Sequence, residues 1–154
     1  MIRRSLDCIT IGGATRDIMF YTSEGMLVNN AEDPLRETLI GFEYGAKITS
    51  RKCYFMLGGG GCNVAVGASR LGLTTAAVMA VGGDRDGDAL LHELRDEAVE
   101  TFAVKRHPNL RTGFSFIVVS ETTGEHVAFL YRGANDALVA TRADLEKKKS
   151  RWIY

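Results

Sequence analysis

The chain has 154 residues, about the length of one domain, and its 45% hydrophobic and 25% charged content is that of an ordinary globular protein. Lysine plus arginine and aspartate plus glutamate each total 19, so no net charge favours nucleic acid or an anionic membrane as a partner. Because no apolar run is long enough to cross a membrane and the start carries no cleavable leader pattern, we expect a cytoplasmic protein.

The cysteines form an odd set without CxxC spacing, and each lies beside apolar residues. Cys8, Cys53 and Cys62 are therefore predicted to be buried free thiols in a reducing compartment. The three histidines follow no metal-ligand spacing, so we expect no metal site.

The first half of the chain begins with strand patterns. A short strand that ends in two glycines is predicted over 6–14, and apolar and aromatic residues predict further strands over 18–23 and 52–57. The segment between the last two suggests a short helix and a hairpin arm.

An α/β pattern follows. Four glycines, 58–61, precede a helix predicted over 62–71, which has small side chains on one face and Gly72 as its C′ glycine. A buried strand over 74–83 and an amphipathic helix over 86–99 come next. Strand, loop, helix, strand and helix in this order predict a parallel sheet.

The last part of the chain changes character. Strand patterns over 112–120 and 125–133, joined by Glu-Thr-Thr-Gly, predict a hairpin. A helix is predicted from Thr141, with the basic run 146–151 as its solvated face. Trp152, Ile153 and Tyr154 resemble the first residues of a buried strand, so we expect the chain to be the front part of a longer protein.

The glycine loop fits neither common phosphate-binding pattern. Asn63 and Val64 stand where GxGxxG would need its last glycine, and no lysine follows as a P-loop requires. Exposed main-chain N–H groups and the Asn63 amide would suit a neutral ligand with several hydroxyls. Alternatively, Asn63 caps the helix and the glycines only turn the strand.

Four ordered motifs carry a family resemblance. GGGGCNVAVGASRLG (58–72), IGGATRD (11–17), VGGDRDG (81–87) and the pair TGFSFIVV and HVAFLYRGAND resemble the signature regions of the ribokinase-like (PfkB) family of carbohydrate kinases. The resemblance covers essentially the whole chain.

The resemblance implies a fold and an activity. The fold would be a doubly wound α/β parallel sheet with a small β lid, of which residues 1–154 would form the N-terminal substrate-binding part, with lid strands near 15–57 and 112–133 and the C-terminal half missing. The activity would be phosphorylation of a hydroxyl of a sugar or nucleoside, with ATP and Mg²⁺ as cofactors of the full-length protein.

It also implies residue roles. Asp17 would accept hydrogen bonds from two substrate hydroxyls, Gly59 would offer bare main chain, and Asn63 would bind another hydroxyl. Thr15 and Gly60 stand where ribokinases proper carry asparagine and lysine, which argues against ribose itself as the substrate.

Other polar and aromatic residues have structural alternatives. Phe114 and Phe116 would line the lid or simply build a sheet. Asp84 and Asp86 are expected to cap the helix that follows, and Asn135 and Asp136 to form a turn.

No catalytic residue is assigned in this chain, because the family's Gly-Ala-Gly-Asp motif does not occur in its sequence. The chain alone is therefore expected to be inactive. The alternative function is a non-catalytic sugar-binding or dimerisation module on the same half fold. A homodimer through the lid strands is a further expectation.

Overall fold

The computed structural model describes residues 5–33 and 35–154. These residues divide into two compact units. The first contains the described residues up to Asp17 together with Phe55–Ser115 and Leu130–Tyr154, and the second contains Ile18–Tyr54 and Phe116–Phe129. Among the described residues, no helix has the length and apolar character needed to cross a membrane.

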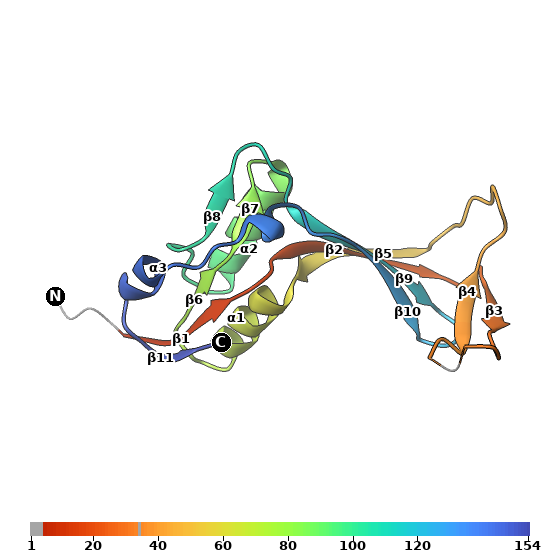
Figure 1. Ribbon diagram of the computed structural model, residues 1–154, viewed down its shortest axis with the longest axis horizontal. Helices are drawn as coiled ribbons and strands as arrows, with labels where there is room; N and C mark the ends of the chain where they lie inside the picture. Colours follow the sequence, from red (N-terminus) through yellow and green to blue (C-terminus); the bar gives the residue numbers. More distant parts are fainter. Residues whose placement is uncertain (1–4, 34) are drawn as a thin grey trace. The chain divides into compact units, whose positions relative to one another are not determined.

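The first unit is built on parallel strands (Figure 1). β1 (Leu6–Ile11) lies between β11 (Ser150–Ile153) and β6 (Thr75–Val78), and both neighbours run parallel to it. A second parallel pair joins β7 (Ala80–Gly82) to β8 (Lys105–His107). The α/β fold class with parallel strands is thus confirmed.

The predicted strand over 74–83 forms two strands instead of one. The Ala77 N–H donates to the Glu100 carbonyl at 3.0 Å, and the Lys105 N–H donates to the Met79 carbonyl at 2.7 Å. β6 thus pairs with β1 on one edge and contacts Glu100 on the other, whereas β7 pairs with β8, and the strand is interrupted at Met79. The predicted burial is correct, because every residue from Thr75 to Gly82 is buried.

Alternate residues of this buried segment face opposite sides of the sheet, as a period of two requires. On one side, α1 (Gly60–Arg70) and α2 (Arg85–Asp96) complete a core that contains Cys62, Ala65, Val66, Ala77, Met79, Val81, Leu90 and Leu94. On the other side, a second core contains Leu6, Ile9, Ala76, Val78 and Ala103, with Phe102, Leu138 and Leu145 packed against it. Both faces of the parallel strands are covered, as predicted.

The helix after the glycines begins earlier than predicted. α1 starts at Gly60 with Gly59 as its N-cap. Asn63 lies inside the first turn, where its N–H donates to the Gly59 carbonyl at 2.9 Å, so the alternative that Asn63 caps the helix is wrong. Gly72 does end the helix as predicted, with φ +90° and its N–H donating to the Ser69 carbonyl.

The C-terminal segment differs from its prediction in two respects. α3 (Arg142–Glu146) is held by a capping box between Thr141 and Asp144 and ends at Glu146, so the basic run 146–151 lies almost entirely beyond it. β11 is the predicted strand. However, Trp152, Ile153 and Tyr154 are 70%, 57% and 62% exposed, because β11 lies at the edge of its sheet.

A second sheet runs β10 (His126–Tyr131), β9 (Gly113–Ser120), β2 (Thr15–Thr22) and β5 (Lys52–Gly58), which confirms the strands predicted in these segments. β3 (Met26–Asn29) and β4 (Thr38–Gly41) form an antiparallel hairpin in the second unit. This hairpin confirms the hairpin arm predicted between β2 and β5. The short helix predicted there is not found among the described residues.

The cysteines are all free, but they are not all buried. Cys62 is buried in α1, Cys8 is half-buried, and Cys53 is exposed. The expectation of three buried thiols is wrong for Cys53, because β5 is an edge strand whose outer residues face solvent.

Candidate functional site

The glycine loop between β5 and α1 lies directly against the loop between β1 and β2. A Cβ atom at Gly61 would come within 2.8 Å of the Gly12 Cα, and one at Gly59, where φ is +90°, would overlap the Gly13 carbonyl. The Cys62 N–H donates to that carbonyl at 3.2 Å. Glycines on both sides therefore allow two main-chain segments to touch.

Gly58 makes room for Asp17. Gly58 is buried, and a Cβ atom there would overlap the Asp17 carboxylate. The Thr15 hydroxyl donates to Asp17 Oδ1 at 2.8 Å, and residues two apart on a strand share a face. The carboxylate is thus held between the Thr15 hydroxyl and bare main chain.

A cavity of about 310 Å³ in the first unit brings four of the predicted residues together. These are Thr15, Gly59, Gly60 and Phe114. A Cβ atom at Gly60 would meet nothing within 4 Å, so Gly60 is the one glycine of the four whose side-chain position is open. The remaining lining residues are Gly13, Ser115, Leu130, Tyr131, Arg132 and Asn135.

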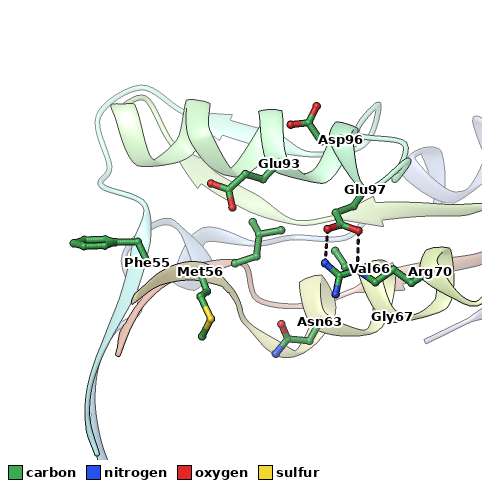
Figure 2. Close-up of a pocket in the computed structure, with 10 residues that line it drawn as sticks. Phe55, Met56, Asn63, Val66, Gly67, Arg70, Glu93, Asp96 and Glu97 are labelled. Carbon is green, nitrogen blue, oxygen red and sulfur yellow. Dashed lines mark hydrogen bonds and ion pairs between the residues drawn. The ribbon is translucent and has the colours of Figure 1, made fainter. Parts of the chain in front are cut away.

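Asn63 lies elsewhere. Its exposed side chain lines a cavity of about 570 Å³ between α1 and α2, together with Arg70, Glu93 and Glu97 (Figure 2). Asp17 is not among the lining residues of either cavity. The structure therefore places Thr15, Gly59 and Gly60 around one cavity, and Asp17 is hydrogen-bonded to Thr15. Asn63 does not line that cavity.

Phe116 also lies apart from this group. It belongs to the second unit, where its ring is 5.7 Å from that of Phe20 and 6.4 Å from that of Phe129. Phe114 pairs with Tyr131 at 5.4 Å in the first unit. Phe116 thus packs against aromatic rings of its own sheet, and its role in a lid stays a prediction.

Two negative groups act on the first turn of α1. Burial, together with the negative charges of Asp17 and Glu93, raises the pKa of the Cys62 thiol to about 11. The thiol therefore stays protonated at neutral pH and serves packing rather than chemistry. Glu93 is in turn paired with Arg16 at 2.8 Å, an ion pair that the sequence patterns did not indicate.

Asp84 has the structural role expected of it. Its carboxylate accepts hydrogen bonds from the Gly87 N–H at 3.0 Å, the Thr112 N–H at 2.9 Å and the Thr112 hydroxyl at 2.5 Å. Burial raises the pKa of Asp84, but these hydrogen bonds together outweigh it and leave the pKa below its ordinary value. Asp86 lies in the first turn of the same helix.

Sequence reasoning missed the role of Asn135. Its amide accepts from the Ala14 N–H and donates to the Ala14 and Arg132 carbonyls, each at 2.9 Å. It therefore ties η1 (Gly133–Ala137) to the start of β2, across 121 positions of sequence. The Gly-Ala-Asn-Asp run indicated only a turn, because a long-range amide bridge leaves no periodic pattern.

The described residues contain no group of three or more histidine, cysteine, aspartate or glutamate side chains that could hold a metal ion. We assign no residue of this chain to Mg²⁺ or ATP.

Comparisons with known proteins agree with one another. Residues 35–151 match a family model described as pfkB family carbohydrate kinase. Ribokinase from Haemophilus influenzae is 31% identical over 94 residues, which is 61% of this chain and 30% of that protein.

Two solved structures resemble the fold. Arabidopsis thaliana ribokinase, complexed with ribose and ATP, aligns with a TM-score of 0.70 and 22% identity over 93% of this chain and 42% of that one. Halothermothrix orenii fructokinase aligns with a TM-score of 0.64 and 26% identity over 88% of this chain and 41% of that one. The chain thus spans less than half the length of each of these relatives.

Proposed function

Because the chain belongs to the pfkB family of carbohydrate kinases, we propose that it supplies the acceptor-binding part of an enzyme that transfers phosphate from ATP to a hydroxyl of a sugar or nucleoside. The observation that carries this proposal is the Asp17 carboxylate, which lies against the main chain of Gly58 and accepts a hydrogen bond from the hydroxyl of Thr15, a residue that lines the 310 Å³ cavity. In this proposal the lid consists of strands within residues 15–57 and 112–133. The three free cysteines fit a reducing compartment such as the cytoplasm.

The chemistry of the acceptor explains these residue types. A carboxylate accepts hydrogen bonds from two neighbouring hydroxyls, and charged hydrogen bonds contribute about 1.5–3 kcal/mol, roughly twice the neutral kind. Gly59 and Gly60 allow a sugar ring to approach the main chain because no side chain intervenes. Phe114 offers an apolar surface beside them. Asn63, one helical turn further on, would reach the acceptor only if the substrate extends beyond this cavity.

Phosphoryl transfer needs positioned groups around the reacting oxygens and the phosphate. The described residues do not fit an ATP–Mg²⁺ site, since they hold no metal-binding cluster and the sequence has no Gly-Ala-Gly-Asp motif. Cofactor binding is therefore assigned to residues outside this chain, and this chain contributes the orientation of the acceptor hydroxyl.

Isothermal titration of the chain with D-ribose, D-fructose, fructose 6-phosphate and adenosine tests the acceptor site. We expect at least one of them to bind, and Asp17→Asn to weaken that binding about 10- to 100-fold, because charged hydrogen bonds are replaced by weaker ones. Asp88→Asn is the matched control, since Asp88 pairs with Arg106 on the exposed face of α2. Equal affinities of wild type and Asp17→Asn for every compound that binds would contradict the assignment.

A further inference from the structure

Arg16 is a buried cation directly beside the proposed acceptor residue. Its side chain is only 9% exposed, and its guanidinium donates to Glu93 Oε1 at 2.8 Å. On a strand, successive side chains point to opposite faces, so Arg16 leaves β2 on the face opposite to Thr15 and Asp17. The ion pair therefore anchors β2 through Arg16, on the face opposite to the Asp17 carboxylate.

Glu93 is itself firmly placed. It lies on α2 next to Leu94, and both Leu90 and Leu94 are fully buried in the core. Figure 2 shows its carboxylate directed from α2 toward the space between α2, α1 and β5. The ion pair thus connects β2 to a helix whose position the hydrophobic core fixes, across 77 positions of sequence.

The Glu93 side chain is 38% exposed, so loss of Arg16 only removes the link between β2 and α2. A buried charge without its partner is strongly unfavourable, so loss of Glu93 forces the buried Arg16 side chain to seek water. For Arg16 this requires movement of the β2 main chain, because the side chain is enclosed. The Asp17 carboxylate tolerates little movement, since it fits against Gly58 only in the absence of a Cβ atom.

We propose that Arg16 and Glu93 are positioning residues, which hold β2 so that the Asp17 carboxylate stays against Gly58 and faces the acceptor. The functional part of this inference rests on the proposed acceptor role of Asp17. The positional part does not, because it concerns the location of Asp17 in the protein without substrate.

Arg70 and Glu97 provide a matched control. They form a second ion pair that joins α1 to α2, with two hydrogen bonds, and they line the same 570 Å³ cavity as Glu93. Neither of them lies on β2. The Arg70 side chain is 68% exposed, so loss of this second pair removes a more solvated ion pair at the same cavity without releasing the strand that carries Asp17.

The first experiment needs no substrate. Backbone amide shifts of the Arg16→Met, Glu93→Gln and Arg70→Met variants are compared with the wild type by NMR, together with the melting temperature of each. We expect Glu93→Gln to shift the Asp17 and Gly58 amides, and Arg16→Met to shift the Gly58 amide, which is remote in sequence from the substitution. Arg70→Met should leave both amides in place. An unchanged Gly58 amide in a folded Arg16→Met or Glu93→Gln variant would overturn the proposal. Glu93→Gln keeps the shape of the side chain, so this variant alone tests the proposal if Arg16→Met does not fold.

The second experiment uses D-fructose and D-ribose as probes, well below each melting temperature. We expect Arg16→Met to weaken binding about tenfold or more, because a misplacement near 1 Å is enough for large losses at a positioned group. Arg16→Lys should restore part of the affinity, and Arg70→Met should stay within twofold of the wild type.

The two proposals fail differently. If the wild type binds none of D-ribose, D-fructose, fructose 6-phosphate and adenosine, the acceptor assignment loses its support while the amide shifts still decide the position of Asp17. If the wild type binds and Asp17→Asn does not, but Arg16→Met binds as the wild type does, the positioning role is refuted and the acceptor site stands.

Discussion

The four consecutive glycines at 58–61 have different surroundings, and substitutions at two of them test the position of the Asp17 carboxylate. Gly58 faces the Asp17 carboxylate and Gly60 faces open space. Gly58→Ala should destabilise the chain by about 1–3 kcal/mol, as overpacking does, because the new Cβ atom must displace Asp17.

Gly60→Ala is the control for this change. It should remain within about 0.5–1 kcal/mol of the wild type and can be stabilising, since alanine is the better helix former. Urea denaturation of both variants measures the difference. Equal losses at positions 58 and 60 would show that the Asp17 carboxylate does not occupy the space beside Gly58.

Asp84 links pH to stability. Its pKa is lowered from the ordinary 3.8 in the folded state, so its contribution is complete above that value and is lost as the pH falls through the folded-state pKa. Asp84→Asn should therefore lower the stability by about 1–2 kcal/mol at pH 7, as loss of an N-cap carboxylate does, and by less at pH 3. Urea midpoints of both proteins at the two pH values test this. A gap that widens toward pH 3 would have the wrong sign.

Asn135 joins two elements that are far apart in the sequence. Asn135→Leu leaves the main-chain groups of Ala14, a fully buried residue, without their partner, which should cost about 1–3 kcal/mol. It should also raise amide exchange at Thr15, because η1 no longer holds the start of β2. Asp136→Ala removes only an exposed ion pair with Arg132, so it should cost about 0–1 kcal/mol. Hydrogen exchange that is unchanged in Asn135→Leu would contradict the bridge.

The elements with a repeating pattern could be predicted, and the exceptions share a cause. β1, α1, α2 and the strands of the second sheet follow from local periodicity and glycine signals, and Asp84 follows from helix capping. The break at Met79, the Asn135 bridge and the Arg16–Glu93 pair depend on partners between 23 and 121 positions away. Such contacts leave no local signal. The separation of Asn63 from Thr15 likewise depends on how α1 is oriented, which glycine spacing does not define.

As a whole, the chain should bind an acceptor without turning it over. A coupled ADP-release assay with ATP, Mg²⁺ and the panel of sugars and nucleosides should give no rate above background, because no residue of this chain is assigned to the phosphate donor. Binding of the same compounds, measured in parallel, is the control that the chain is folded and competent. Robust ADP release would refute the assignment of donor chemistry to residues outside it.

The second unit exposes apolar side chains that a second copy of the chain could cover. Met26 and Leu27 on β3 and Phe129 on β10 are 64%, 56% and 60% exposed, and unpaired strand edges next to apolar surface favour association. We expect a homodimer through these strands. Leu27→Glu should shift the molar mass measured by light scattering from dimer toward monomer, because a charge would be buried at the interface.

Leu71→Glu is the control for this change. It alters a leucine of the first unit that is 85% exposed, and it should leave the molar mass unchanged. A wild-type chain that is strictly monomeric at high concentration would exclude this interface, and equal effects of the two substitutions would place the contact outside the lid strands.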